Sequence, residues 1–85
     1  MDYQITAIAP QYRNPKPHYG IATQLGMRIN QDQFGNDYAY QVIAELGKAK
    51  TLVSTLLHYQ YGVKIWTTDG VTGQPLSIRG LFETR

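Results

Sequence analysis

The chain contains no cysteine, and this absence narrows what can stabilise it. Disulfides and thiolate metal sites are excluded, although small domains commonly rely on one or the other. The chain has 85 residues, which is enough for a single domain over residues 1–85 and too few for two. Its stability therefore has to come from packing alone, or from packing together with self-association.

Long apolar runs are also absent. No segment approaches the roughly 20 apolar residues of a membrane span. The first residues, Met1–Ala9, lack the basic and apolar regions of a signal peptide. We therefore expect a soluble cytoplasmic protein that makes no membrane contact.

Charge is scarce as well, at 16% of the residues, with a net charge of +2. Such a mild excess of positive charge permits a polyanionic partner without requiring one. The chain is instead rich in tyrosine, with seven residues. Because tyrosine is enriched where proteins meet, this composition favours contact with a partner.

Catalytic motifs are missing too. The chain has no glycine-rich phosphate loop and no nucleophile motif. Its two histidines, His18 and His58, fall in separate predicted elements and have no neighbouring ligands at metal-binding spacing. We expect no cofactor and no metal, and we interpret the protein as non-enzymatic.

Alternating residues predict two strands in the first third of the chain. Tyr3–Ala9 alternates and contains β-branched residues, and Pro10 ends it. The proline-rich segment 10–17 predicts an extended loop. Gly20–Ile29 alternates again, and we expect this second strand to pair with the first.

The middle of the chain predicts a single helix from about Asp37 to about Gln60. Apolar residues recur there every three or four positions, at Val42, Leu46, Ala49, Val53 and Leu56. An alternative is a strand over Tyr38–Leu46 followed by a shorter helix from Lys48, because the strand residues also alternate. Gly47 would cost a helix interior about 1 kcal/mol, but Lys48 and Lys50 would oppose the dipole of a helix that begins beside them.

The last quarter of the chain predicts a β-hairpin made of strands Val63–Thr68 and Leu76–Phe82. The segment Asp69–Pro75 between them has the residues of a turn. In the expected register Ile65 faces Ile78, and Lys64 lies opposite Arg79. The predicted fold class is α+β: a four-stranded antiparallel sheet in the order β-β-α-β-β, with one helix packed across one face. The other face would be open.

The candidate binding residues lie on that open face. Trp66, the only tryptophan, shares the outward side of the predicted hairpin with Lys64 and Arg79, and Arg28 would extend the group on the second strand. An aromatic ring beside cations suits a contact with an anion or a nucleic acid. The alternative is that Trp66 is covered by a loop, by neighbouring side-chain stems or by a second subunit.

These residues support three hypotheses. The first is a binding module that docks a protein partner on the open face, with Trp66 as the anchor and the cations steering the partner. The second is a single-stranded nucleic-acid-binding protein that uses the same face together with Arg13 and Lys16 of the proline-rich loop. The third is a homodimeric structural protein whose sheets meet, since small domains often enlarge their core in this way.

Overall fold

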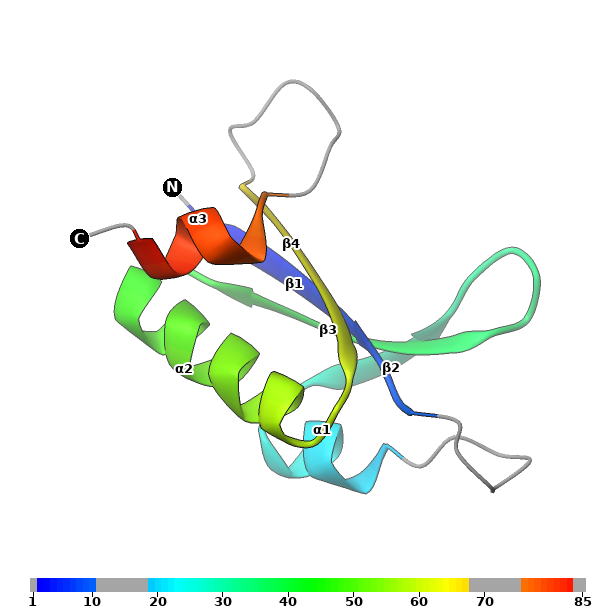
Figure 1. Cartoon of the computed structure of the whole chain (residues 1–85). Coiled ribbons are helices and arrows are strands. Elements are labelled where there is room, and N and C mark those ends of the chain that lie inside the picture. Colours follow the sequence, from blue (N-terminus) through cyan, green and yellow to red (C-terminus); the bar gives the residue numbers. More distant parts are fainter. Residues whose placement is uncertain (1, 11–18, 68–75, 84–85) are drawn as a thin grey trace.

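Four strands form one antiparallel sheet, with helices packed on one of its faces (Figure 1). The structure, a computed structural model, describes residues 2–10, 19–67 and 76–83. In chain order its elements are β1 (Tyr3–Ile8), α1 (Gly20–Gln24), β2 (Arg28–Gln31), β3 (Asp37–Ile43), α2 (Leu46–His58), β4 (Gly62–Thr67) and α3 (Ile78–Glu83). The α+β class and the four-stranded antiparallel sheet are confirmed, whereas the predicted β-β-α-β-β order and the single helix are wrong.

The sheet order is β2-β3-β1-β4, so each helical crossover spans a strand. The crossover through α1 joins β1 to β2 across β3, and the crossover through α2 joins β3 to β4 across β1. This is the split β-α-β arrangement that ferredoxin-like domains use, here followed by α3. The topology brings the first and last strands together at one side of the sheet, and it specifies no function by itself. In the described part of the chain, no helix has the length and apolar character needed to cross a membrane.

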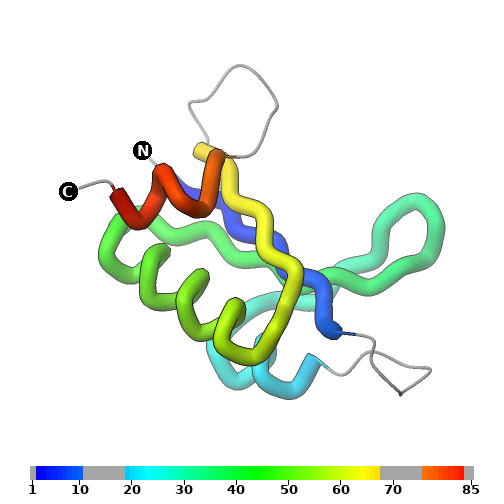
Figure 2. Tube along the Cα trace, in the orientation of Figure 1, coloured from blue at the N-terminus to red at the C-terminus, as the bar shows by residue number. Residues whose placement is uncertain are grey.

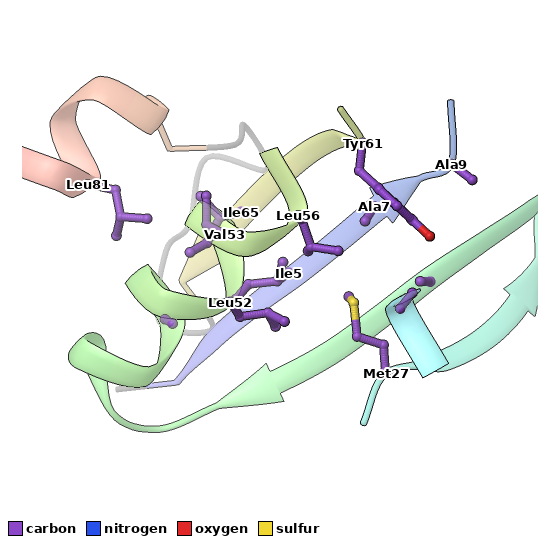
Figure 3. Packing of buried hydrophobic residues seen from close by; sticks show 13 residues of the cluster. Ile5, Ala7, Ala9, Met27, Leu52, Val53, Leu56, Tyr61, Ile65 and Leu81 are labelled. Atoms are coloured by element: carbon purple, nitrogen blue, oxygen red, sulfur yellow. The ribbon is translucent and has the colours of Figure 1, made fainter. Parts of the chain in front are cut away.

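The core lies between the sheet and α2. Ile5 and Ala7 of β1 and Ile65 of β4 point toward this helix and are fully buried, as Figure 3 shows for their side chains. The helix contributes its buried stripe, which consists of Ala49, Leu52, Val53 and Leu56. The predicted apolar stripe is therefore confirmed at Ala49, Val53 and Leu56.

The predicted helix over Asp37–Gln60 is wrong in its first half, which forms β3. The alternative of a strand followed by a shorter helix is the one the structure adopts, with α2 beginning at Leu46. Period-two alternation decides between them, because it buries Ala39 beneath the helices while Val42 stays half-exposed on the opposite face. This burial outweighs the unfavourable interaction of Lys48 and Lys50 with the helix dipole. In addition, Nζ of Lys48 lies 3.7 Å from Oε2 of Glu45, the N-cap residue.

The predicted strand over Gly20–Ile29 is also wrong. Its first half forms α1, and β2 begins only at Arg28. Tertiary contacts explain the helix: Ala22 is fully buried, and the ring of the preceding Tyr19 packs edge-on against that of Tyr61, with centroids 6.2 Å apart. The expected pairing of the first two strands is wrong as well, because β3 lies between β1 and β2.

The predicted C-terminal hairpin does not form, because Leu76–Phe82 contains most of α3. The Ser77 hydroxyl accepts a hydrogen bond from the N–H of Gly80 at 3.2 Å, as an N-cap residue does. Leu81 is buried and Ile78, three residues earlier, is partly buried against the core, so helical spacing places both there. Lys64 therefore lies opposite Thr6 of β1, not Arg79. The predicted turn at Asp69–Pro75 falls outside the described residues.

Two adjacent leucines in α2 test this packing. Leu56 is fully buried, whereas its neighbour Leu57 is 41% exposed. We expect Leu56→Ala to lower the free energy of unfolding by about 2–5 kcal/mol, because it removes buried methyl groups and leaves a cavity. Leu57→Ala should change it by no more than about 0.5 kcal/mol. Urea denaturation followed by circular dichroism measures both, and equal losses would contradict the placement of α2.

Candidate functional site

The face of the sheet that the described helices leave uncovered is the candidate site. Residues that pair directly across neighbouring strands share a face, so the register defines it. We call it the open face. It consists of Gln4, Thr6, Ile8, Arg28, Asn30, Tyr38, Tyr40, Val42, Gly62, Lys64 and Trp66. None of these positions holds an acidic residue.

Three aromatic side chains lie on the open face. Tyr38 and Tyr40 are next-but-one neighbours on β3, with ring centroids 6.4 Å apart and planes inclined by 50°. Trp66 lies two strands away on β4, where it pairs with Gln4 of β1. All three side chains are partly exposed. The rings therefore stand on both sides of the central strand β1, whose outward side chains are the polar Gln4 and Thr6 and the apolar Ile8.

Two cations lie at opposite ends of one row of paired residues. Arg28 pairs with Tyr40, Tyr40 pairs with Thr6, and Thr6 pairs with Lys64. Both charged side chains are exposed. Because neighbouring strands are about 4.8 Å apart, the two backbone positions are separated by roughly 14 Å. The row thus places one cation on each edge strand, with an aromatic ring and a hydroxyl between them.

The open face is hollowed in two adjoining places. A depression of about 530 Å³ is lined by Gln4, Thr6, Asn30, Tyr38, Tyr40 and Trp66. A larger groove of about 920 Å³ shares Thr6, Tyr38 and Trp66 with it. The groove extends past Lys64 and Gly62 to the turn between β2 and β3, where Asp32, Gly35, Asn36 and Asp37 line it. Together the hollows form one continuous concave surface from Trp66 to that turn.

The layer of helices offers a smaller hollow. It has a volume of about 380 Å³ and lies between α2 and β3, with Leu25, Ile43 and Leu52 among its lining residues. Thr51 and Thr55 in its lining donate hydrogen bonds to helix carbonyl oxygens, whereas Oε1 of Gln41, which also lines it, is buried without a hydrogen-bond partner among the described residues. Within the described residues, no group of three or more potential metal ligands exists. The open face is therefore the surface with the most side chains able to contact a ligand.

The structure brings together three of the residues predicted to bind. Trp66, Lys64 and Arg28 all lie on the open face, as expected. Arg79 does not, because it belongs to α3 in the helical layer, where its Nε lies 3.1 Å from Oε1 of Glu83. Its predicted position beside Trp66 was a consequence of the wrong hairpin. Arg13 and Lys16 lie outside the described residues.

Sequence reasoning missed the contribution of β3. Tyr38 and Tyr40 were assigned to the predicted helix, which would have sent them to different sides. The signal that could have found them is their alternation with Ala39, which the strand alternative contained. Gln4 and Asn30 were missed because their position depends on which strands pair, and a single sequence does not reveal that.

Comparison with known proteins gives no further guide to the site. No family model matches the chain, and no matching curated protein or solved structure was found.

The turn between β2 and β3 is held by one carboxylate. Oδ1 of Asp32 accepts hydrogen bonds from the N–H of Phe34 at 2.8 Å and from the N–H of Asn36 at 3.0 Å. The bond from Asn36 is the main cause that lowers the pKa of Asp32 below its ordinary 3.8, and the bond from Phe34 acts in the same direction. Since the ionised form is the stronger acceptor, the carboxylate supports the turn most at higher pH.

We therefore expect the turn to loosen in acid. A lowered pKa means that the carboxylate's contribution is present above the ordinary value and is lost as the pH falls through the lowered one. In an NMR titration, the amide protons of Phe34 and Asn36 should shift with a midpoint below 3.8. Asp32→Asn, which keeps an acceptor oxygen but cannot titrate, should abolish this shift. A midpoint at or above the ordinary value would contradict the turn geometry.

Proposed function

We propose that the protein binds single-stranded nucleic acid across the open face of its sheet. The observation that carries this proposal is the depression that is lined by three aromatic rings and three uncharged hydrogen-bonding side chains. A nucleobase presents a flat π face and a polar edge, so it needs both kinds of partner. Tyr38, Tyr40 and Trp66 supply stacking surfaces, while Gln4, Thr6 and Asn30 can bond base edges.

The cations suit the same ligand. Arg28 and Lys64 stand on the two edge strands, outside the depression, so each can meet a phosphate while bases occupy the space between them. Arg can also stack on a base, which Lys cannot do. No open-face position holds an acidic residue, although the adjoining groove is lined at its turn end by two, Asp32 and Asp37.

A single strand fits this surface better than a duplex. Stacking on a side chain requires bases that are not already stacked in a helix, and four-stranded sheets that bind RNA use aromatic side chains in this way. Tyr38, Ala39 and Tyr40 reproduce the aromatic-small-aromatic centre of the pattern found in such sheets. The rest of the pattern is not matched, because its leading basic residue and glycine are replaced by Asn36 and Asp37, and its valine and last aromatic residue by Gln41 and Ile43. The chain therefore has the two outward rings and the small inward residue of this pattern, but it lacks the leading basic residue.

One observation supports the alternative hypothesis that the open face docks a protein partner. Ile8 and Val42 lie on the open face and are 51% and 50% exposed. Two half-exposed aliphatic residues would suit an apolar partner surface. The nucleic-acid proposal accounts for more of the face, because the rings there are separated by polar side chains and do not form one apolar patch.

Loss of single rings provides the main test. Base stacking on an aromatic side chain contributes about 1–3 kcal/mol, so we expect Trp66→Ala and Tyr40→Ala each to weaken binding of a single-stranded decanucleotide about 5- to 150-fold. Tyr59→Ala is the matched control, because Tyr59 is exposed at the end of α2 in the helical layer. Fluorescence anisotropy of labelled RNA and DNA at low salt measures the affinities.

Three outcomes of that test are informative. Loss of affinity at Trp66 and Tyr40 with none at Tyr59 supports the proposal, provided that circular dichroism shows all variants folded. If no oligonucleotide binds at low salt, the proposal fails, and protein docking through Ile8 and Val42 becomes the better account. If light scattering shows a dimer that Trp66→Ala dissociates, the open face is an interface between two copies.

Salt dependence tests the cations. For a single strand the logarithm of the affinity falls with the logarithm of salt concentration at a slope of about −0.7 per neutralised phosphate. Arg28→Gln and Lys64→Gln should each make the slope shallower by about 0.7. Lys48→Gln, on the exposed side of α2, should leave the slope unchanged. Equal effects of all three substitutions would show that only net charge matters, and not position on the open face.

A further inference from the structure

We infer that Phe34, at the tip of the β2–β3 hairpin, is an additional stacking contact for the same single strand beyond the edge of the sheet. This inference rests on the proposed function and extends its binding surface to a residue outside the open face. Three features of the hairpin lead to it: the exposure of Phe34, the order of the turn that presents it, and the groove that runs from the open face to that turn.

The ring of Phe34 is exposed and takes no part in the hydrophobic core. Its side chain is 78% exposed, the largest value among the exposed large hydrophobic residues of the described chain. It is absent from the core cluster and from the residues packed against that cluster. An isolated exposed aliphatic residue is ordinary, but a nearly free aromatic ring on an ordered turn offers a π face to a ligand.

The turn fixes the backbone that carries this ring. Besides the two bonds to the Asp32 carboxylate, the N–H of Asp32 donates to the carbonyl of Asn36 at 2.9 Å. The N–H of Gly35 donates to the carbonyl of Asp32 at 3.1 Å. Gly35 has φ +81°, a conformation that suits glycine and closes the turn. A ring presented by a preordered turn loses less conformational entropy on binding than one on a free loop.

The hairpin lies where the ligand would leave the open face. Asp32, Gly35, Asn36 and Asp37 line the same groove as Lys64 and Trp66, so the groove connects the stacking rings to the hairpin and passes two carboxylates there. Figures 1 and 2 show the β2–β3 hairpin extending well beyond the ends of the neighbouring strands. Phe34 lies in the turn four residues before Tyr38, so the two backbone positions are at most about 14 Å apart. A strand that continues along the groove from Tyr38 therefore reaches Phe34 only if it is long enough.

Ligand length distinguishes this contact from those on the sheet. We expect Phe34→Ala to weaken binding of a single-stranded decanucleotide by at least about 5-fold, the lower limit for loss of one stacked base. A tetranucleotide, held by the rings of the open face, should bind Phe34→Ala as it binds the unchanged protein. Phe34→Tyr keeps a stacking ring and should restore the affinity for the decanucleotide. Phe82→Ala is the matched control, because Phe82 is an exposed phenylalanine on α3 in the helical layer.

The results separate this inference from the proposal on which it rests. If the unchanged protein binds no decanucleotide, the proposed function fails and the inference falls with it. If the decanucleotide binds, and Phe34→Ala behaves like Phe82→Ala, the inference is wrong while the proposed function stands. Equal loss for the tetranucleotide and the decanucleotide would also overturn it, since the substitution would then act through the sheet. So would a change of oligomeric state in Phe34→Ala without nucleic acid, because the ring would then be a contact between copies.

Discussion

β1 is hydrogen-bonded on both sides, to β3 and to β4, and the alternation of its side chains divides the molecule into two surfaces. Ile5 and Ala7 face the helices and are fully buried, while Gln4 and Thr6 face the other way. The register with β3 and β4 extends this division across the sheet. A slip of one residue would exchange the two faces, so the burial of Ile5 and Ala7 also fixes where Tyr40 and Trp66 point.

Small residues in the core explain why the aromatic side chains are available for binding. Besides Ala7, the buried positions include Ala9, Ala22, Ala39 and Ala49. Alanines at these positions let the helices approach the sheet closely and leave no room there for large rings. Tyr61 is an exception, since it is buried beneath α1, and this burial raises its pKa. Tyr38, Tyr40 and Trp66 lie on the face that the described helices leave uncovered, where their rings do not disturb the packing of the core.

Local patterns in the sequence predicted what depends on neighbouring residues and failed where distant contacts decide. Alternation found β1 and β4, and it placed Trp66 and Lys64 on the outward side correctly. It failed for α3 because Leu76, Ile78 and Gly80 alternate, yet Ile78 and Leu81 also have the spacing that buries one side of a helical turn. The register predicted for the hairpin agreed with the alternation of both segments, although the hairpin does not form. Such agreement shows only that two segments could pair as strands, and it does not exclude that one of them is a helix.

The stability of the short helices also depends on contacts that local sequence patterns do not reveal. An isolated helix as short as α1 or α3 is not stable in water, so its existence depends on burial of Ala22 or Leu81 by elements far away in the sequence. The strand pairing is equally nonlocal, because β1 pairs with β3 and β4 and not with β2. The fold class and one side of β4 were therefore within reach of sequence reasoning. The grouping of Gln4, Asn30 and Tyr38 around Trp66 was not.

The balance of forces on the open face indicates what kind of recognition it can perform. If the open face binds a single strand as proposed, counterion release at its two cations would give a salt slope of about −1.4, and the affinity would change only about 7-fold between 50 and 200 mM salt. Stacking, at about 1–3 kcal/mol per ring, would then outweigh attraction to phosphate. Because rings bind only bases that lie at their positions, the spacing of Tyr38, Tyr40 and Trp66 would determine which conformations of a strand are accepted. The register of β1 with its two neighbours sets that spacing, so the same pairing that buries the core also shapes the surface offered to a ligand.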